Sequence, residues 1–153
     1  MKMGFDLIAL KPKSEEYRRF INNVWGWRPL WAFVTKVCSD LLTEEQINGG
    51  HINDGVLINE ELALGIARRL KKIIESGFAE HQAGSFQDRK DKVGMITCNA
   101  CDGTLIHKYT GEPCMICRGT GKVKPMVTAY HFSIENLKEF VKFCENSGGF
   151  EIW

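Results

Sequence analysis

Two CxxC pairs, separated by twelve residues, constrain this chain more than any other feature of its sequence. Zinc takes four soft ligands in a tetrahedron, and the two residues between paired cysteines let one tight turn aim two sulfurs at one ion. A glycine stands two places after the second cysteine of each pair, where a positive φ lets backbone N–H groups approach the thiolates. The sequence therefore predicts a structural Zn²⁺ site with four ligands: Cys98, Cys101, Cys114 and Cys117.

The same cysteines have two other interpretations, a pair of disulfides or a set of unrelated thiols. Disulfides are typical of secreted proteins, and residues 1–13 lack the apolar run and cleavage site of a signal peptide. Redox-active CxxC pairs would not explain two matching units that share a following glycine. A catalytic zinc is disfavoured because four thiolates leave no open coordination position. We therefore expect a cytoplasmic protein, since thiols stay reduced there.

The residues around the cysteines predict an inserted zinc ribbon at 94–124. Residues 104–109 favour β structure, and Thr-Gly-Glu-Pro at 110–113 is a turn signal. Residues 95–97 and 122–124 are expected to form flanking strands. All four ligands would then lie at strand ends or turns and face one point.

The strings CNACDGT and CMICRGTGKV resemble the cysteine-rich zinc module of DnaJ-type co-chaperones, which repeats CxxCxGxG. This chain has two such units where that family has four, and it contains no His-Pro-Asp tripeptide of a J-domain. The resemblance implies a zinc site and not co-chaperone activity.

Residues 1–93 and 125–153 are expected to form an α+β core with about three main helices and a few short strands. The helical stripes run from Pro29 to about residue 42, from Glu60 to Ser76, and from Ser133 to about residue 146. Strands are expected at 4–10 and 127–132. We also expect a short helix at 14–22, a capping box at 43–46, a helix or linker at 78–92 and a tail at 150–153.

Three longer strings resemble a family of small uncharacterised bacterial and phage proteins: MGFDLIALKPKSEEYRRFINNVWGWRPLWAFV, HINDG and FSIENLKEFVKFCENSGGFEIW. In that family these blocks recur with or without a cysteine insert. The resemblance implies that the zinc ribbon is an accessory and that the terminal parts form the common core. It implies no particular activity.

Tryptophans and polar residues in two segments predict a second candidate site, for a small ligand such as a nucleotide or for hydrolysis. Aromatic faces beside an arginine can stack a flat ligand, and a His–Asp pair can act as a base and its orienting partner. The alternative is that the tryptophans are core anchors and the loop is a turn. The candidate binding residues are Asn23, Trp25, Trp27, Arg28 and Asn53, and the catalytic candidates are His51 and Asp54.

Charge and hydropathy exclude some classes of function. The net charge is +1, so a nucleic-acid role would need a local basic patch, and no apolar run approaches the roughly 18–20 residues of a membrane span. No P-loop, GxGxxG, HExxH or GxSxG motif occurs, which disfavours an enzyme of those classes. We expect a zinc-binding adaptor for a protein partner, with nucleic acid as the second possibility through Lys108, Arg118, Lys122 and Lys124. Two further sets complete the predictions: Cys38 and Cys144 as buried hydrophobes, and a basic helix face at Arg68, Arg69, Lys71 and Lys72 as a weaker phosphate patch.

Overall fold

A computed structural model describes residues 4–153 of the chain. Residues 1–3, with which the predicted core begins, lie outside the described residues. The fold is α+β, as predicted, and it divides into two compact units. The first unit runs to Gln87 and resumes at Tyr130, and the second is Asp88–Ala129, which contains the predicted insert at 94–124.

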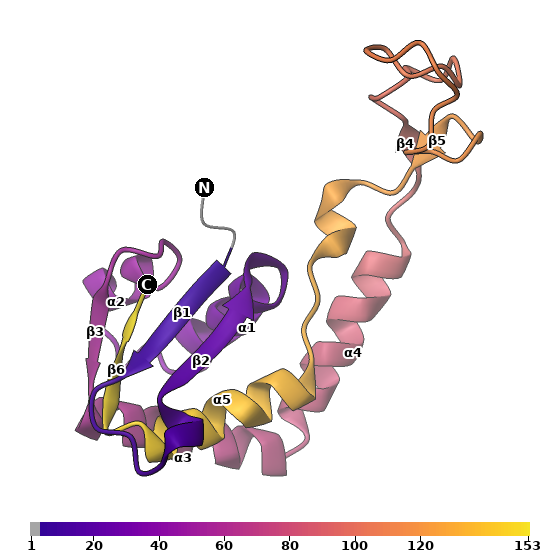
Figure 1. Cartoon of the computed structure of the whole chain (residues 1–153). Helices are drawn as coiled ribbons and strands as arrows, with labels where there is room; N and C mark the ends of the chain where they lie inside the picture. The colour runs from indigo at the N-terminus through magenta and orange to yellow at the C-terminus, as the bar shows by residue number, and fades with distance from the viewer. Residues whose placement is uncertain (1–3) are drawn as a thin grey trace. The chain divides into compact units, whose positions relative to one another are not determined.

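The first unit is built on a four-stranded antiparallel sheet with the order β2-β1-β6-β3 (Figure 1). Side chains alternate in this sheet, so that Leu7, Phe150 and Ile152 are fully buried while Ile8 and Leu57 are exposed on the opposite face. One face of the sheet therefore carries the core. The strands are β1 (Gly4–Ala9), β2 (Arg19–Asn23), β3 (Val56–Asn59) and β6 (Gly149–Ile152).

Helices pack on the buried face, and side chains cap most of them. Asn23 accepts the Gly26 N–H at 2.9 Å at the start of the first long helix, and Asn59 accepts the Leu62 N–H at 2.8 Å at the start of the next. The predicted capping box at Thr43 is confirmed. The helices are α1 (Val24–Val37), α2 (Glu44–Gly49), α3 (Glu60–Glu75), α4 (Phe78–Asp91) and α5 (Ile134–Asn146), with one 3₁₀ turn, η1 (Glu15–Tyr17).

Two tryptophans anchor the core. Trp27 and Trp31 are both fully buried and stack with ring centroids 5.4 Å apart. Their indole N–H groups donate to the carbonyl oxygens of Gly50 at 2.8 Å and Ile47 at 3.0 Å. The two buried rings thus also fix the C-terminal end of α2.

The proline inside α1, Pro29, leaves one carbonyl oxygen of the helix without its usual donor, and a residue far along the chain supplies a replacement. The predicted helix was to begin at Pro29, but α1 begins at Val24 and places the proline within it. A proline has no N–H, so the carbonyl oxygen of Trp25, four residues earlier, loses its helical donor. The N–H of His131 donates to that oxygen instead, at 3.1 Å. This bond ties α1 to the chain that returns from the second unit.

Three local predictions were wrong. The segment expected as a helix at 14–22 contains only η1 before β2, because the alternating residues of β2 pair with β1. The strand expected at 127–132 is replaced by a 3₁₀ turn, η2 (Met126–Ala129), which Thr128 closes through the Pro125 carbonyl oxygen at 2.7 Å. The expected tail is β6, an inner strand of the sheet.

The second unit contains little regular structure. Two short strands, β4 (Ile96–Thr97) and β5 (Lys122–Val123), pair antiparallel at the positions predicted for the flanking strands. Between them the predicted hairpin is reduced to one bridge, Ile106 with Pro113. The chain enters this unit through α4 and leaves it before Phe132, and in the first unit the rings of Phe86 and Phe132 lie 6.5 Å apart. Within residues 4–153, no helix is long and apolar enough to cross a membrane.

Candidate metal centre

The two CxxC turns have the same backbone conformation. In each, the residue after the second cysteine has a φ of 51° (Asp102 and Arg118), and the glycine that follows has a φ of 80° or 81°. A third left-handed residue comes two places later, with a φ of 71° at Leu105 and 72° at Gly121. Left-handed backbone is uncommon for residues other than glycine. The two turns therefore share one backbone conformation, even at Asp102, Leu105 and Arg118, which are not glycines.

Reciprocal hydrogen bonds join the two turns. The N–H of Cys98 donates to the carbonyl oxygen of Gly121 at 2.9 Å, and the N–H of Cys114 donates to that of Leu105 at 2.8 Å. Each turn thus binds the equivalent residue of the other. The pattern is that of a local two-fold arrangement, in which two copies of one motif present their cysteines to a shared centre.

A threonine closes each turn from within. Thr104 donates its hydroxyl to the Cys101 carbonyl oxygen at 2.6 Å, and Thr120 donates to that of Cys117 at 2.7 Å. These two threonines occupy the same place in the repeated motif. Sequence reasoning assigned them no role, although their repetition was the signal that could have found them.

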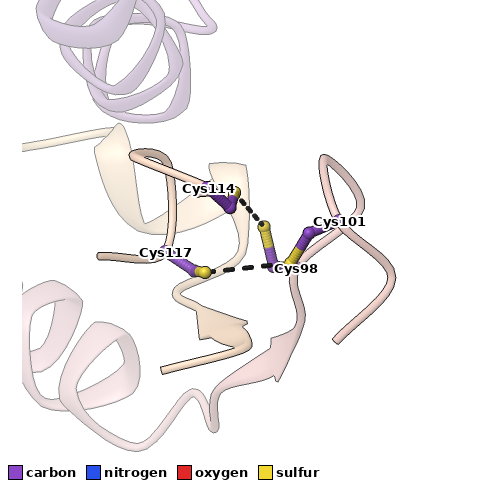
Figure 2. Close-up of side chains that lie close together, drawn as sticks. All are labelled: Cys98, Cys101, Cys114 and Cys117. Carbon is purple, nitrogen blue, oxygen red and sulfur yellow. Dashed lines mark hydrogen bonds between the residues drawn. The ribbon is translucent and has the colours of Figure 1, made fainter. Parts of the chain in front are cut away.

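The four cysteine sulfurs meet at one point, and Figure 2 shows them turned toward one another. All four Sγ atoms lie within 4.8 Å of each other, with 3.9 Å between Cys98 and Cys114 and 3.8 Å between Cys101 and Cys117. A tetrahedron with metal–sulfur distances of 2.3 Å requires edges of about 3.8 Å. These separations far exceed the roughly 2.05 Å of a disulfide bond, and all four cysteines are free thiols.

Burial and hydrogen bonds from backbone N–H groups shift the pKa values of two of the four thiols. Burial raises the pKa of Cys117, but the N–H groups of Gly121 and Gly119 and the neighbouring thiols outweigh it and lower that pKa to about 6. Burial raises the pKa of Cys101 to about 11. Burial disfavours a thiolate, and a divalent cation among the four sulfurs would offset that cost.

The residues present therefore fit a four-thiolate metal site. Soft sulfur ligands in a tetrahedron suit zinc. Backbone N–H groups also hydrogen-bond two of the sulfurs, those of Gly103 and Leu105 to Cys101 and those of Gly119 and Gly121 to Cys117. The four buried cysteines could hold a metal ion in the arrangement that their spacing predicted. With every ligand position filled by sulfur, such a site would support structure rather than catalysis.

Around this centre the apolar side chains face outward. Tyr109 is 89% exposed, and Met115 and Ile116, which lie between the second pair of cysteines, are 78% and 63% exposed. The full set of exposed large apolar residues in the second unit is Met95, Ile96, Leu105, Ile106, Tyr109, Met115, Ile116, Met126 and Val127. The unit also carries seven Lys and Arg against four Asp and Glu. Its surface is therefore both apolar and basic.

The residues predicted for the second candidate site are divided between two environments. Trp27 lies in the core, and Asn23 caps α1. Asn53 donates its Nδ2 to the Gly4 carbonyl oxygen at 3.2 Å, which fixes the loop against β1. Asp54 lies exposed in the same loop. Three of these four residues therefore have a role in the fold, and Asp54 lies at the surface.

A smaller group does come together beside α1. Trp25 packs edge-on against Tyr130 with ring centroids 4.8 Å apart, and Arg28 donates to the Tyr130 hydroxyl at 3.2 Å. His51 is close enough to Arg28 to respond to its charge. Burial, followed by that charge, lowers the His51 pKa below its ordinary value. Tyr130 was not predicted, because only folding brings a residue so distant in sequence to α1.

No family model, curated protein or solved structure matches the chain. The assignment of the metal centre therefore rests on the positions of its four sulfurs.

Proposed function

We propose that the second unit is a structural zinc module, and that it docks on a protein partner through the apolar side chains around its metal centre. The observation that carries the first half is the cluster of four buried sulfurs within 4.8 Å. Four thiolates would hold one Zn²⁺ and keep the two turns together. The cysteines are ligands, and no step of chemistry is assigned to the metal.

The second half rests on what lies outside the cluster. Large exposed apolar patches with a polar rim mark interaction sites on soluble proteins. Met115 and Ile116 project from a turn that the metal fixes, so they lose little conformational freedom on binding. The nearby cations include Arg118 and Lys122. The complementary partner is a protein segment with apolar and acidic side chains.

Zinc binding is tested by elemental analysis of the purified, reduced protein. We expect one zinc per chain, and loss of that zinc in Cys117→Ser. The matched control is Cys38→Ala, which removes a buried thiol of the first unit and should leave the zinc content unchanged. A reduced chain that takes up no zinc would refute the proposal.

Docking is tested by crosslinking in cells, followed by identification and purification of the crosslinked protein. We expect Met115→Ser with Ile116→Ser to weaken binding of that purified protein while zinc content stays at one per chain. The control pair, Ile8→Ser with Ile21→Ser, removes exposed apolar side chains from the sheet of the first unit. Equal weakening by both pairs would contradict the proposal. Binding to single-stranded nucleic acid that falls steeply with salt would replace the protein partner by nucleic acid.

A further inference from the structure

A hollow of about 240 Å³ lies against α3 in the first unit, far in sequence from the cysteines. Four of its lining residues come from one face of α3, at relative positions i, i+3, i+4 and i+7. The fifth comes from the turn that follows α1. The lining residues are Leu41, Gly65, Arg68, Arg69 and Lys72, so three of the five carry a positive charge.

One of the three cations is already neutralised. The guanidinium of Arg69 donates to both carboxylate oxygens of Asp40, at 2.8 and 2.9 Å, and also to the Val37 carbonyl oxygen at 2.7 Å. These hydrogen bonds lower the pKa of Asp40 to about 2, so the carboxylate stays ionised at neutral pH. Arg69 is therefore held in place and forms a fixed wall of the hollow.

The other two cations have no such partner. Among residues 4–153, neither Arg68 nor Lys72 belongs to an ion pair. They stand four residues apart on the helix, a spacing at which like charges repel and destabilise the helix. An anion between them would remove that repulsion.

The glycine among the lining residues, Gly65, is not required by the packing. Glycine inside a helix is destabilising relative to alanine. A Cβ at Gly65 would meet Leu41 Cδ1 at 3.9 Å and Arg68 Nη2 at 4.0 Å, which are ordinary contacts. At Gly50, by contrast, a Cβ would lie 2.2 Å from the Trp31 ring. The missing side chain at Gly65 leaves the space beside Leu41 and Arg68 open.

We propose that this hollow binds the phosphate group of a small molecule, with Arg68 and Lys72 as its charged contacts. A guanidinium presents paired N–H donors that match phosphate oxygens, and a lysine adds a point charge. The hollow is smaller than the roughly 300–1,000 Å³ of pockets for drug-sized ligands. It therefore suits inorganic phosphate or a compact phosphomonoester and is too small to enclose a nucleotide. This site is independent of the zinc module.

The test is calorimetric titration of the full-length protein with inorganic phosphate at constant ionic strength. We expect saturable binding at one site, and Arg68→Gln and Lys72→Gln should each raise Kd about tenfold, as expected for loss of a charge-assisted hydrogen bond. Gly65→Met should abolish binding by filling the space. Lys13→Gln is the control, because it removes one charge at an exposed site that does not line the hollow.

A parallel titration with glycerol 3-phosphate separates the two sources of the phosphate group. Tighter binding than inorganic phosphate assigns the site to a phosphomonoester, and equal binding assigns it to phosphate itself. Gly65→Ala should fold with an unchanged or higher Tm, which shows that position 65 can be substituted. Binding without saturation in the wild type, or equal weakening by Lys13→Gln and Arg68→Gln, would overturn the proposal.

Discussion

The two units of this molecule bury opposite kinds of residue. In the first unit the largest apolar side chains are inside, and Trp27, Trp31 and Phe140 have no exposed surface. In the second unit the buried side chains are the four cysteines, while Tyr109 and Met115 are 89% and 78% exposed. The first unit is ordered by its apolar core, and the second has no comparable core among its described residues.

This difference is the one that a metal ion bound by the four cysteines would allow in a small unit. A short chain seldom buries enough apolar surface to fold alone, and a metal is one of the usual substitutes. With sulfur–metal bonds to provide the order, apolar side chains would not be needed inside. They become available to other molecules, which is the property that the proposed docking requires.

The largest expected effect comes from removing the metal, because the two units should then respond most differently. Structural zinc contributes about 10–16 kcal/mol in zinc-finger peptides, so its loss should unfold residues 88–129. We expect a strong chelator to abolish amide protection there in hydrogen exchange, while β1 and α3 keep theirs. Protection that persists throughout the second unit after chelation would show that the comparison is wrong.

The converse experiment perturbs the first unit alone. Trp27→Ala removes a fully buried ring that packs on Phe5, Trp31 and Phe140. We expect the free energy of unfolding to fall by about 3–5 kcal/mol, the usual range for deleting a buried aromatic side chain. Denaturant titration followed by circular dichroism measures this, and zinc content should stay the same. Lower zinc content in the folded variant than in the wild type under the same conditions would mean that the units are energetically linked.

A smaller effect is expected within the second unit, where the two turns differ at one position. Leu105 has a φ of 71° at the place where the other turn has Gly121. Left-handed backbone costs a residue with a side chain about 1–2 kcal/mol relative to glycine. Leu105→Gly should therefore strengthen zinc retention against a competing chelator. Gly121→Leu is the matched control and should weaken zinc retention. Weaker retention in Leu105→Gly than in Gly121→Leu would show that the backbone at Leu105 is not strained.

The smallest effect is expected from the surface ion pair between Asp40 and Arg69. The folded-state pKa of Asp40, about 2, lies below its ordinary value of 3.8. The ion pair therefore contributes its full stability at a pH above the ordinary pKa of 3.8, and that contribution is lost as the pH falls through the folded-state pKa of about 2. Asp40→Asn should be less stable than wild type at pH 5, and the difference should shrink as the pH falls toward 2. A constant difference across this range in urea denaturation would exclude a role for the charge.

The cluster of four cysteines could be predicted almost completely from the sequence, because its members are close in the chain and repeat one motif. Spacing located the cysteines, and the residues beside them located both flanking strands. The main helices followed from apolar periodicity for the same reason, since both are local signals. Leu105 is the exception, because a strained φ at a leucine has no signature in the sequence.

The sheet could not be predicted to the same extent, because its pairing is set by distant parts of the chain. Residues 150–153 are too few to identify as a strand until β1 and β3 are known to flank them. Similarly, Pro29 indicates that the Trp25 carbonyl oxygen needs an outside donor, but only the folded chain identifies it as His131. Residues that depend on such long-range contacts, including Tyr130, were missed for this reason.

The contact between Phe86 and Phe132 gives the second unit a further property. The chain leaves the first unit just after Phe86 and returns to it just before Phe132, and the rings of these two residues lie 6.5 Å apart. A segment with adjacent ends can be shortened, exchanged or lost with only a small change in loop-closure entropy for the rest. We therefore expect that residues 88–129 can be removed as one cassette, with a few glycines and serines closing the gap. The same cassette could be transplanted into a surface loop of an unrelated host.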